Sequence, residues 1–312
     1  MLSRVASELY WMGRHLERAE HIARYCKVQY FGSLDAPLSL NKDFALSSIL
    51  NMTGIEYEAG DLDERWVLGQ VAFNDIHGGS ILSSVKSGRE CARGARDFIS
   101  TELWEGVNRY YYFVNSYSQE YYQSQGLYDF SQAVAEKSYA VKGAIDNALL
   151  QDTSWHFIQI GLHLERVVQV ARCMISKIND IEIVRLFEET KSLEHHQWMT
   201  LLRSVEAADM LKRVCNKPPT SLEVLNFLLL DYRFPRSIYF NLVELKKYVD
   251  ELSDLKVYPK DSTQFAVGKI RDSFKYMEIK GKDTTELKTM LNQIITDIYA
   301  VSDQLVKEYL QY

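Results

Sequence analysis

A sixteen-residue segment near the start of the chain occurs a second time in its middle. Residues 9–24 align with residues 157–172 when the sequence is shifted by 148 positions. Seven of the sixteen positions are identical, whereas unrelated sequences would share about one. The identical pairs are Gly13 and Gly161, His15 and His163, Leu16 and Leu164, Glu17 and Glu165, Arg18 and Arg166, Ala23 and Ala171, and Arg24 and Arg172. This repetition predicts an internal duplication with one equivalent element in each half.

Both copies are predicted to be helices, the first from about Arg4 to Tyr30 and the second from about Trp155 to Ile178. In the first copy, apolar residues recur at the spacing of one helix face, namely Val5, Leu9, Met12, Leu16, Ala19, Ala23 and Cys26. The opposite face combines both signs of charge and consists of Tyr10, Gly13, Arg14, Glu17, Glu20, His21 and Arg24. We expect the apolar face to be buried against other helices.

The second copy keeps only part of this charged face. It retains Glu165, Arg166 and Arg172, but replaces Arg14, Glu20 and His21 with Leu162, Val168 and Gln169. The second helix is therefore expected to be buried on more sides than the first. Because a buried charge is costly unless it is paired, Glu165 and Arg172 should have partners. Glu20 has only Val168 as its counterpart and is expected to face solvent or a pocket, so Glu20→Ala should be less destabilising than Glu165→Ala.

The rest of the sequence also favours helices. With only 5 Pro and 15 Gly in 312 residues the chain has few helix breakers, and no segment alternates like a strand. Further helices are expected at 43–52, around 66–71, from Ser80, from Ser100 or Thr101, at 130–149, 194–212 and 222–230, from Ser237, and at 284–312. Capping residues are expected before the second repeated helix, at 152–154, and before the helix at 222–230, at 220–221. Residues 73–81, which include His77, resemble residues 230–238 at an offset of 157. We therefore predict an all-α helical bundle of two pseudo-twofold related repeats, 1–148 and 149–312, packed as one compact unit.

Composition excludes several classes of partner. A formal charge of −6 provides no field that would attract nucleic acid or an anionic membrane. The four cysteines show no CxxC spacing and are expected to be reduced core residues. No apolar segment resembles a signal peptide or a membrane span. These features predict a cytoplasmic protein.

Motifs for catalysis and cofactor binding are absent from the sequence. It contains no P-loop, GxGxxG, HExxH or GxSxG, and no cofactor is expected. Glu17, Glu20 and His21 have side chains that can bind metal, but the Glu-x-x-His pattern of di-metal bundles does not recur, so no metal site is predicted. The charged positions are either a structural ion-pair network or a polar pocket that binds a ligand or peptide. The candidate binding residues are Tyr10, Arg14, Glu17, Glu20, His21, Arg24, Glu165, Arg166 and Arg172.

Four segments together resemble the alpha-E domain family of bacteria. They are residues 1–24, 80–108, 155–166 and 234–238. The chain departs from the family at His77-Gly78-Gly79, where the family usually has Asn-Pro followed by a small residue. The resemblance implies an all-helical protein of unknown activity, encoded beside ATP-grasp ligases and transglutaminase-like peptidases and assisting peptide synthesis or modification.

These observations support three hypotheses about function. The first is a non-catalytic helical binding or scaffold module that serves an ATP-grasp ligase or a transglutaminase-like peptidase, with Tyr10, Glu17, His21 and Arg24 forming the binding face. The second is an enzyme that uses Glu17, Glu20, His21 and Arg24 for acid–base work on an amide or peptide substrate. The third is a purely structural protein that oligomerises.

Overall fold

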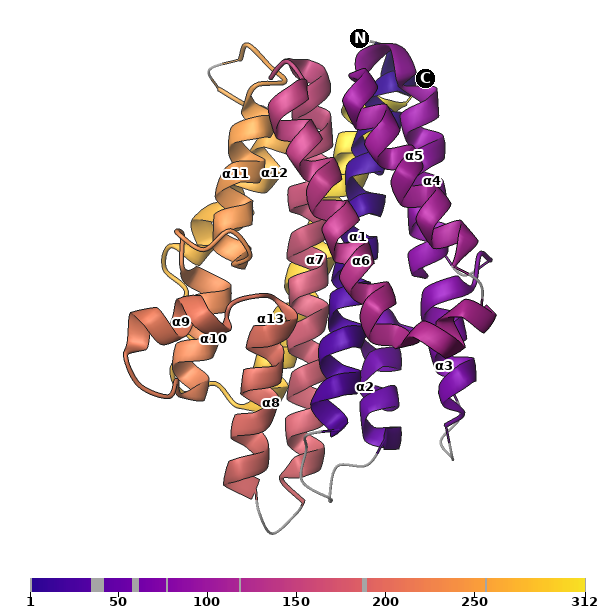
Figure 1. Ribbon diagram of the computed structural model, residues 1–312. Coiled ribbons are helices and arrows are strands. Elements are labelled where there is room, and N and C mark those ends of the chain that lie inside the picture. Colours follow the sequence, from indigo (N-terminus) through magenta and orange to yellow (C-terminus); the bar gives the residue numbers. More distant parts are fainter. Residues whose placement is uncertain are drawn as a thin grey trace.

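Helices make up all the regular structure of the described part of the chain (Figure 1). The computed structural model describes residues 2–34, 42–57, 62–76, 78–117, 119–186, 190–255 and 257–311. The α-helices are α1 (Ser3–Leu34), α2 (Lys42–Thr53), α3 (Glu64–Phe73), α4 (Ile81–Gly94), α5 (Thr101–Ser116), α6 (Gln119–Ala148), α7 (Thr153–Val184), α8 (Thr190–Ser204), α9 (Ala208–Cys215), α10 (Ser221–Leu230), α11 (Ile238–Asp250), α12 (Thr263–Phe274) and α13 (Thr284–Leu305). The 3₁₀ turn η1 (Arg96–Phe98) follows α4, and the π turn η2 (Val306–Leu310) follows α13. The predicted all-α class is confirmed.

Capping side chains begin several helices where the sequence predicts it. Ser80, Ser100 and Ser237 each accept a hydrogen bond from a backbone N–H of the first turn that follows. Asp152 does the same at the start of α7, and Thr220 forms a capping box with the third residue of α10. Such caps satisfy N–H groups that would otherwise lack partners at the helix start.

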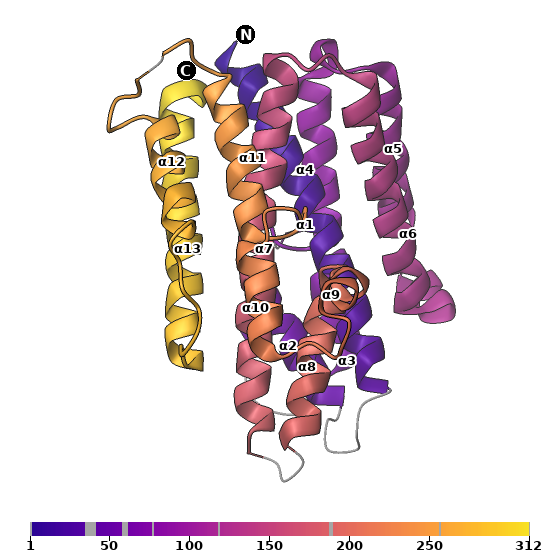
Figure 2. The same cartoon turned by 90° about the vertical axis from the view of Figure 1, so that its left-hand side faces the viewer.

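The long helices α1 and α7 form the centre of the molecule. They pack on each other more extensively than any other pair of helices. Helices α4, α5 and α6 lie on one side of this pair, and α11, α12 and α13 lie on the other (Figure 2). The predicted apolar face of α1, from Val5 to Cys26, is buried throughout. The repeated segments therefore form the two helices against which the rest of the chain packs.

Two repeated glycines allow α1 and α7 to approach closely. A Cβ on Gly13 would collide with the carbonyl oxygen of Ile158, and a Cβ on Gly161 would collide with that of Tyr10. In both cases the obstacle is backbone, which cannot move aside as a flexible side chain can. Glycine is therefore required at both positions by the helix–helix contact.

Several predicted helix ends are wrong. Helix α1 continues through Gly32 to Leu34, because one glycine costs a helix only about 1 kcal/mol and does not by itself end it. Helix α6 begins at Gln119, eleven residues before the predicted start. The single helix predicted at 194–212 is interrupted between α8 and α9 by Glu206, which has a φ of 54°. His77 lies outside the described residues. No helix in the described ranges has the length and hydropathy needed to cross a membrane.

Candidate functional site

The two repeated Glu-Arg pairs meet where α1 and α7 pack together. Glu17 accepts hydrogen bonds from Nε and Nη2 of Arg166 at 2.6 and 3.0 Å. Glu165 accepts from Nε and Nη2 of Arg18 at 2.7 and 3.1 Å. Both carboxylates are buried, with 0 and 1 % exposure. Each glutamate is thus bound in bidentate fashion by the arginine of the opposite helix, a geometry that makes a strong ion pair.

Additional donors surround each buried carboxylate. Glu165 also accepts from Nε of Arg14 and from Nε2 of Gln169, both at 2.8 Å. Burial alone would raise its pKa, but Arg14 and Arg18 outweigh that effect and hold the pKa below its usual range. The prediction that Glu165 has partners is therefore confirmed.

Glu17 has a similar surrounding. Lys142 of α6 places Nζ 2.6 Å from its Oε2, and His21 places Nε2 3.1 Å from its Oε1. Burial would raise the pKa of Glu17, but Arg166 and Lys142 lower it well below its usual range. Both glutamates are therefore ionised across the physiological pH range.

The same arginines also contact the turns that precede α4 and α11. Nη1 of Arg18 donates to the carbonyl oxygen of Gly78, and Nη1 of Arg166 donates to that of Pro235, both at 3.4 Å. Each arginine therefore links its own helix to the carboxylate of the opposite helix and to a turn.

These two turns have matching internal hydrogen bonds. The side chain of Asn74 accepts from the backbone N–H of Ile76, and that of Asp231 accepts from Arg233, both at 2.9 Å. The hydroxyls of Ser80 and Ser237 donate back to the carbonyl oxygens of Asn74 and Asp231, respectively. Short side chains that bond to nearby backbone in this way favour tight turns.

A second group of charges lies beside Glu17 and begins at Glu20. Glu20 is fully buried and forms ion pairs with Arg24, Lys142 and Arg236, the last at 2.9 Å. It also accepts from the hydroxyl of Ser138 at 3.1 Å. The expectation that Glu20 faces solvent or a pocket is wrong, because three cations from α1, α6 and the turn before α11 enclose its carboxylate.

Glu206, in the link between α8 and α9, lies at the outer edge of this group. Its Oε2 accepts from Nη2 of Arg236 at 2.8 Å, and its Oε1 accepts from the hydroxyl of Tyr139 and lies 3.5 Å from Nε of Arg24. The side chain of Glu206 is 43 % exposed, whereas that of Arg24 is 5 % exposed. Glu206 is therefore the member of the group that contacts solvent most.

Burial lowers the pKa of three groups here. It lowers the pKa of Lys142 to about 7, an effect that Glu17 opposes and that Arg166 and Arg236 reinforce. It lowers the pKa of His21 to about 4, against the contribution of Glu17, and that of Arg24 to about 10, with Arg236 acting in the same direction. Lys142 is consequently the one group of the three that titrates near neutral pH.

The predicted binding face of α1 is not a surface. Tyr10, Arg14, Glu17, Glu20, His21 and Arg24 are all buried. Tyr10 lies with its hydroxyl 2.7 Å from Oγ of Ser302 on α13. The charged face of α1 is covered because α6 and α7 contribute cations that match its carboxylates, so side chains that are polar in sequence lie inside the fold. Arg172 lies apart from both groups and donates to the hydroxyl of Tyr299 at 3.0 Å.

Among the site residues that were not predicted are Tyr139, Lys142, Glu206 and Arg236. Arg236 lies in the segment 234–238 that resembles the family, and this was the available signal. The other three have no local motif. Among the described residues, no group of three or more His, Cys, Asp and Glu side chains has a geometry that could hold a metal ion.

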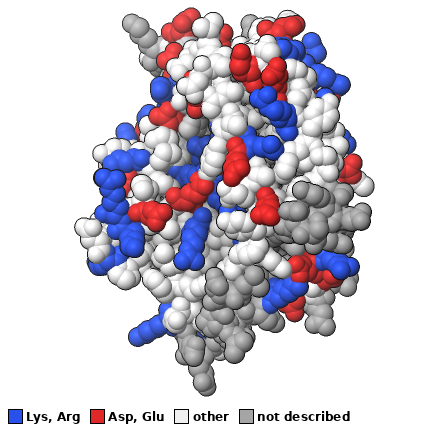
Figure 3. All heavy atoms as spheres, in the orientation of Figure 1, with Lys and Arg blue, Asp and Glu red and all other residues white. Residues whose placement is uncertain are grey.

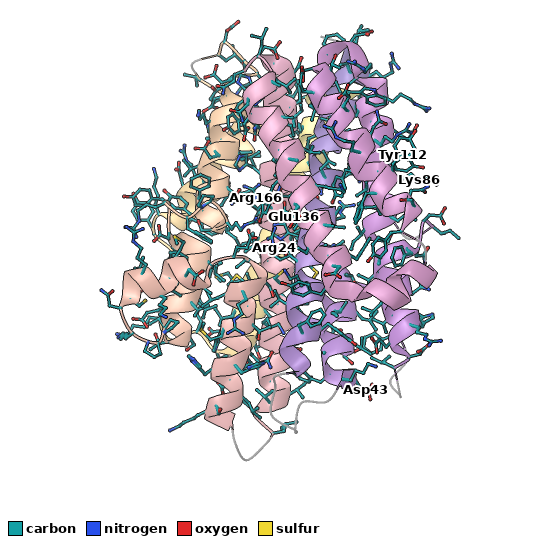
Figure 4. All side chains as sticks on the ribbon, in the orientation of Figure 1. Arg24, Asp43, Lys86, Tyr112, Glu136 and Arg166 are labelled. Carbon is teal, nitrogen blue, oxygen red and sulfur yellow. The ribbon has the colours of Figure 1, made fainter. Side chains whose placement is uncertain are left out.

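Arg24 and Arg166 lie near the middle of the face seen in Figure 4. In the same orientation, Figure 3 shows Lys and Arg side chains set back in the middle of this face, with Asp and Glu side chains beside them.

Comparison with known proteins identifies the family but no activity. The chain is 23 % identical over 279 residues to "Uncharacterized protein Mb2597" of Mycobacterium bovis and to "Uncharacterized protein Rv2567" of Mycobacterium tuberculosis. The matches cover 83 % of this chain but only 30 % of those proteins. No solved structure has significant similarity to the chain. Residues 1–310 match Alpha-E, described as a predicted alpha-helical domain with a conserved ER motif, and the two Glu-Arg pairs fit that description. The chain therefore belongs to the Alpha-E family.

Proposed function

We propose that the chain is a non-catalytic helical binding or scaffold module that assists an ATP-grasp ligase or transglutaminase-like peptidase in peptide synthesis or modification. The observation that supports a non-catalytic role is the full pairing of Glu17 and Glu165. Each is buried, ionised and bound by three neighbouring side chains. A general acid or base needs a pKa near the working pH, and both carboxylates are held well away from it.

The length of the mycobacterial relatives supports the existence of a partner. The matched region is 30 % of each relative, so most of each relative lies outside it. A module that is covalently joined to other sequence in one protein can bind the equivalent sequence as a separate chain in another. The identity of that partner as a ligase or peptidase comes from the family resemblance.

We also propose that residues 1–148 and 149–312 are pseudo-twofold related repeats. Four matched features support this: the reciprocal Glu-Arg pairs, the two close-contact glycines, the two turns bound by arginine, and the serine caps of α4 and α11. Superposition of α1 on α7 tests the proposal, and it should also superpose α4 on α11.

The proposed compartment is the cytoplasm. All four cysteines are free in the structure, and free buried cysteines are typical of reducing compartments. A ligase partner would also require ATP. Fractionation of the native host, with detection of the chain by antibody, tests this assignment.

Lys142 provides the observation that favours the alternative, an enzyme acting on an amide or peptide. Its amine has a pKa lowered to about 7, within the range of a general base or nucleophile. His21, by contrast, has a pKa lowered to about 4 and is completely buried, so it lacks the access that acid–base work on a substrate needs.

The test is reconstitution with the ligase encoded nearest the chain. We expect the two purified proteins to elute together in gel filtration, and we expect the chain alone neither to hydrolyse ATP nor to cleave or modify a peptide. Mixed charges at a protein interface provide specificity, so the complex should weaken with salt. Peptide turnover by the chain alone that Lys142→Gln abolishes would establish the enzyme instead.

A further inference from the structure

Glu206 occupies a backbone position that usually belongs to glycine. Helix α8 ends in a Schellman motif, in which the N–H of Ala207 donates to Leu202 at 2.7 Å and that of Glu206 donates to Arg203 at 3.1 Å. The residue in the left-handed conformation of this motif is Glu206, with a φ of 54°. Glycine is favoured there because it has no Cβ. A glutamate at this position therefore needs a compensating role for its side chain.

The side chain of Glu206 contacts two largely buried arginines and Tyr139, which is 43 % exposed. Its two carboxylate oxygens contact Tyr139, Arg236 and Arg24, and the Glu206 side chain remains about half exposed. The carboxylate is thus more exposed to solvent than the two arginines with which it pairs. It can leave by rotating its own side-chain bonds, without movement of a helix.

The residues behind Glu206 have an excess of positive charge. The ion pairs of this group join the carboxylates of Glu17, Glu20 and Glu206 to three arginines, Arg24, Arg166 and Arg236, and to Lys142, whose pKa of about 7 makes it a partial cation at neutral pH. His21 is neutral at pH 7 because burial lowers its pKa to about 4. If Glu206 leaves, two carboxylates remain to balance the cations. This imbalance favours replacement of Glu206 by another anion.

Arg24 has donor capacity that its described neighbours leave unused. Its side chain is 5 % exposed, and no described residue accepts a hydrogen bond from its Nη1. A buried guanidinium N–H without an acceptor is costly. Nε of the same guanidinium lies 3.5 Å from Oε1 of Glu206 and also lacks a hydrogen-bond acceptor among the described residues. These unused donors are independent evidence for an anion site.

We infer that Arg24, Arg236 and Tyr139 form a binding site for the carboxylate of a peptide, and that Glu206 occupies this site in the free protein. The two oxygens of Glu206 already show how a carboxylate is held there, by one guanidinium and one phenol hydroxyl. The peptide carboxylate is either a C-terminus or an acidic side chain. The carboxylate chemistry comes from the contacts of Glu206, whereas the peptide as ligand class rests on the proposed function in peptide synthesis or modification. The inference does not require a ligase partner, because the site lies within this chain.

Occupation by Glu206 sets the affinity of the site. A ligand must compete with a side chain that is already in place, so its apparent affinity falls in proportion to the fraction of molecules in which the site is open. The site therefore favours ligands that make contacts beyond the carboxylate. Removal of Glu206 should expose the intrinsic affinity.

The test uses Glu206→Gly in the full chain and isothermal titration calorimetry at low salt. Glycine suits the left-handed backbone, so this change empties the site and keeps the end of α8. The probes are the peptides Ac-Ala-Ala-Ala with a free C-terminus, Ac-Ala-Glu-Ala-NH2 and the neutral Ac-Ala-Gln-Ala-NH2. We expect at least one of the two carboxylate peptides to bind Glu206→Gly about tenfold or more tightly than it binds the natural protein, and the neutral peptide not to bind. Whichever of the two peptides binds more tightly shows whether the site recognises a C-terminal or a side-chain carboxylate.

Two further variants make the result decisive. Asn216→Gly changes the other described residue that is not glycine and has a positive φ, also 54°, and should leave binding unchanged. Tyr139→Phe combined with Glu206→Gly removes a hydroxyl of the site and should weaken binding several-fold. The inference is overturned if Glu206→Gly binds neither carboxylate peptide more tightly, if the neutral peptide binds equally, or if inorganic phosphate binds as tightly as the peptides. Failure here leaves the ligase complex as a separate question, because no partner protein is present.

Discussion

A carboxylate removed from water is stable only where enough donors replace its hydration, and Glu17, Glu20 and Glu165 each meet this condition. Transfer of an ion into a protein interior costs several kcal/mol even after relaxation. Every one of the three accepts or pairs with at least three side chains. At this scale the site is a set of charges that stabilise one another and that are costly to break singly.

Removal of one carboxylate should therefore leave buried cations unpaired. We expect Glu165→Ala and Glu20→Ala each to lower the free energy of unfolding by about 3–5 kcal/mol, because both residues are buried ion-pair partners. Urea unfolding of both variants checks this. Glu194→Ala is the control, since Glu194 pairs with the half-exposed Arg185, and it should cost about 1 kcal/mol or less. If Glu20→Ala lowers the free energy of unfolding by no more than the Glu194→Ala control does, that result would contradict the burial described for Glu20.

Lys142 should make stability depend on pH. Its pKa in the folded protein is lowered to about 7, whereas the pKa of a lysine in an unfolded chain is about 10.4. Between these values the unfolded chain binds a proton that the folded protein does not, so the contribution of Lys142 to stability rises as pH increases from about 7 to about 10. Urea unfolding across this range should show a smaller rise for Lys142→Gln than for the natural protein. The exposed Lys86 supplies a control, Lys86→Gln, that should keep the natural slope.

At the scale of elements, the close contact between α1 and α7 depends on two glycines, Gly13 and Gly161. Gly161→Ala places a methyl group against the carbonyl oxygen of Tyr10. Overpacking by one carbon typically costs about 1–3 kcal/mol, and here the obstacle is backbone, so the loss should be about 3 kcal/mol or more. Gly143→Ala in α6 is the matched control, because nothing lies within 4 Å of its added Cβ. It should stabilise the protein by about 0.5–1 kcal/mol. Thermal melts that rank the two variants the other way would contradict the close contact.

The sequence predicts elements well where local signals exist and poorly where tertiary contacts decide. Serine, threonine and aspartate caps were recognisable, and α4, α5, α7, α10 and α11 begin where these residues predict. The end of α8 was not predictable, because Glu206 adopts a conformation that its own residue type disfavours. The repeat located Glu17 and Arg166, but not Lys142, whose partners are more than 120 positions away in the chain. The face of α1 was predicted to be open because its covering cations lie on other helices.

At the scale of the whole molecule, neither half supplies the ion-pair partners that the charged residues of its own central helix need. Glu17 needs Arg166, and Arg18 needs Glu165. We expect fragments 1–148 and 149–312, expressed separately, to be insoluble or largely unfolded, because each exposes the face by which α1 and α7 meet. Co-expressed, they should assemble, since the cut falls beside the exposed Leu150 and leaves every helix whole. Affinity purification with a tag on one fragment, followed by circular dichroism, checks this. A stable, folded single fragment would contradict it.

The reciprocal Glu-Arg pairs also impose an order on events at the ribosome. Arg166 follows Glu17 by 149 positions, and translation proceeds at about 5–20 residues per second, so Glu17 is synthesised roughly 7–30 seconds before its bidentate partner. Throughout that interval the nascent first half has a carboxylate without its bidentate partner, and the face of α1 that carries Gly13 and Glu17 is not covered by α7. The chain therefore completes its core only late in synthesis, and its first half depends on protection from aggregation until then.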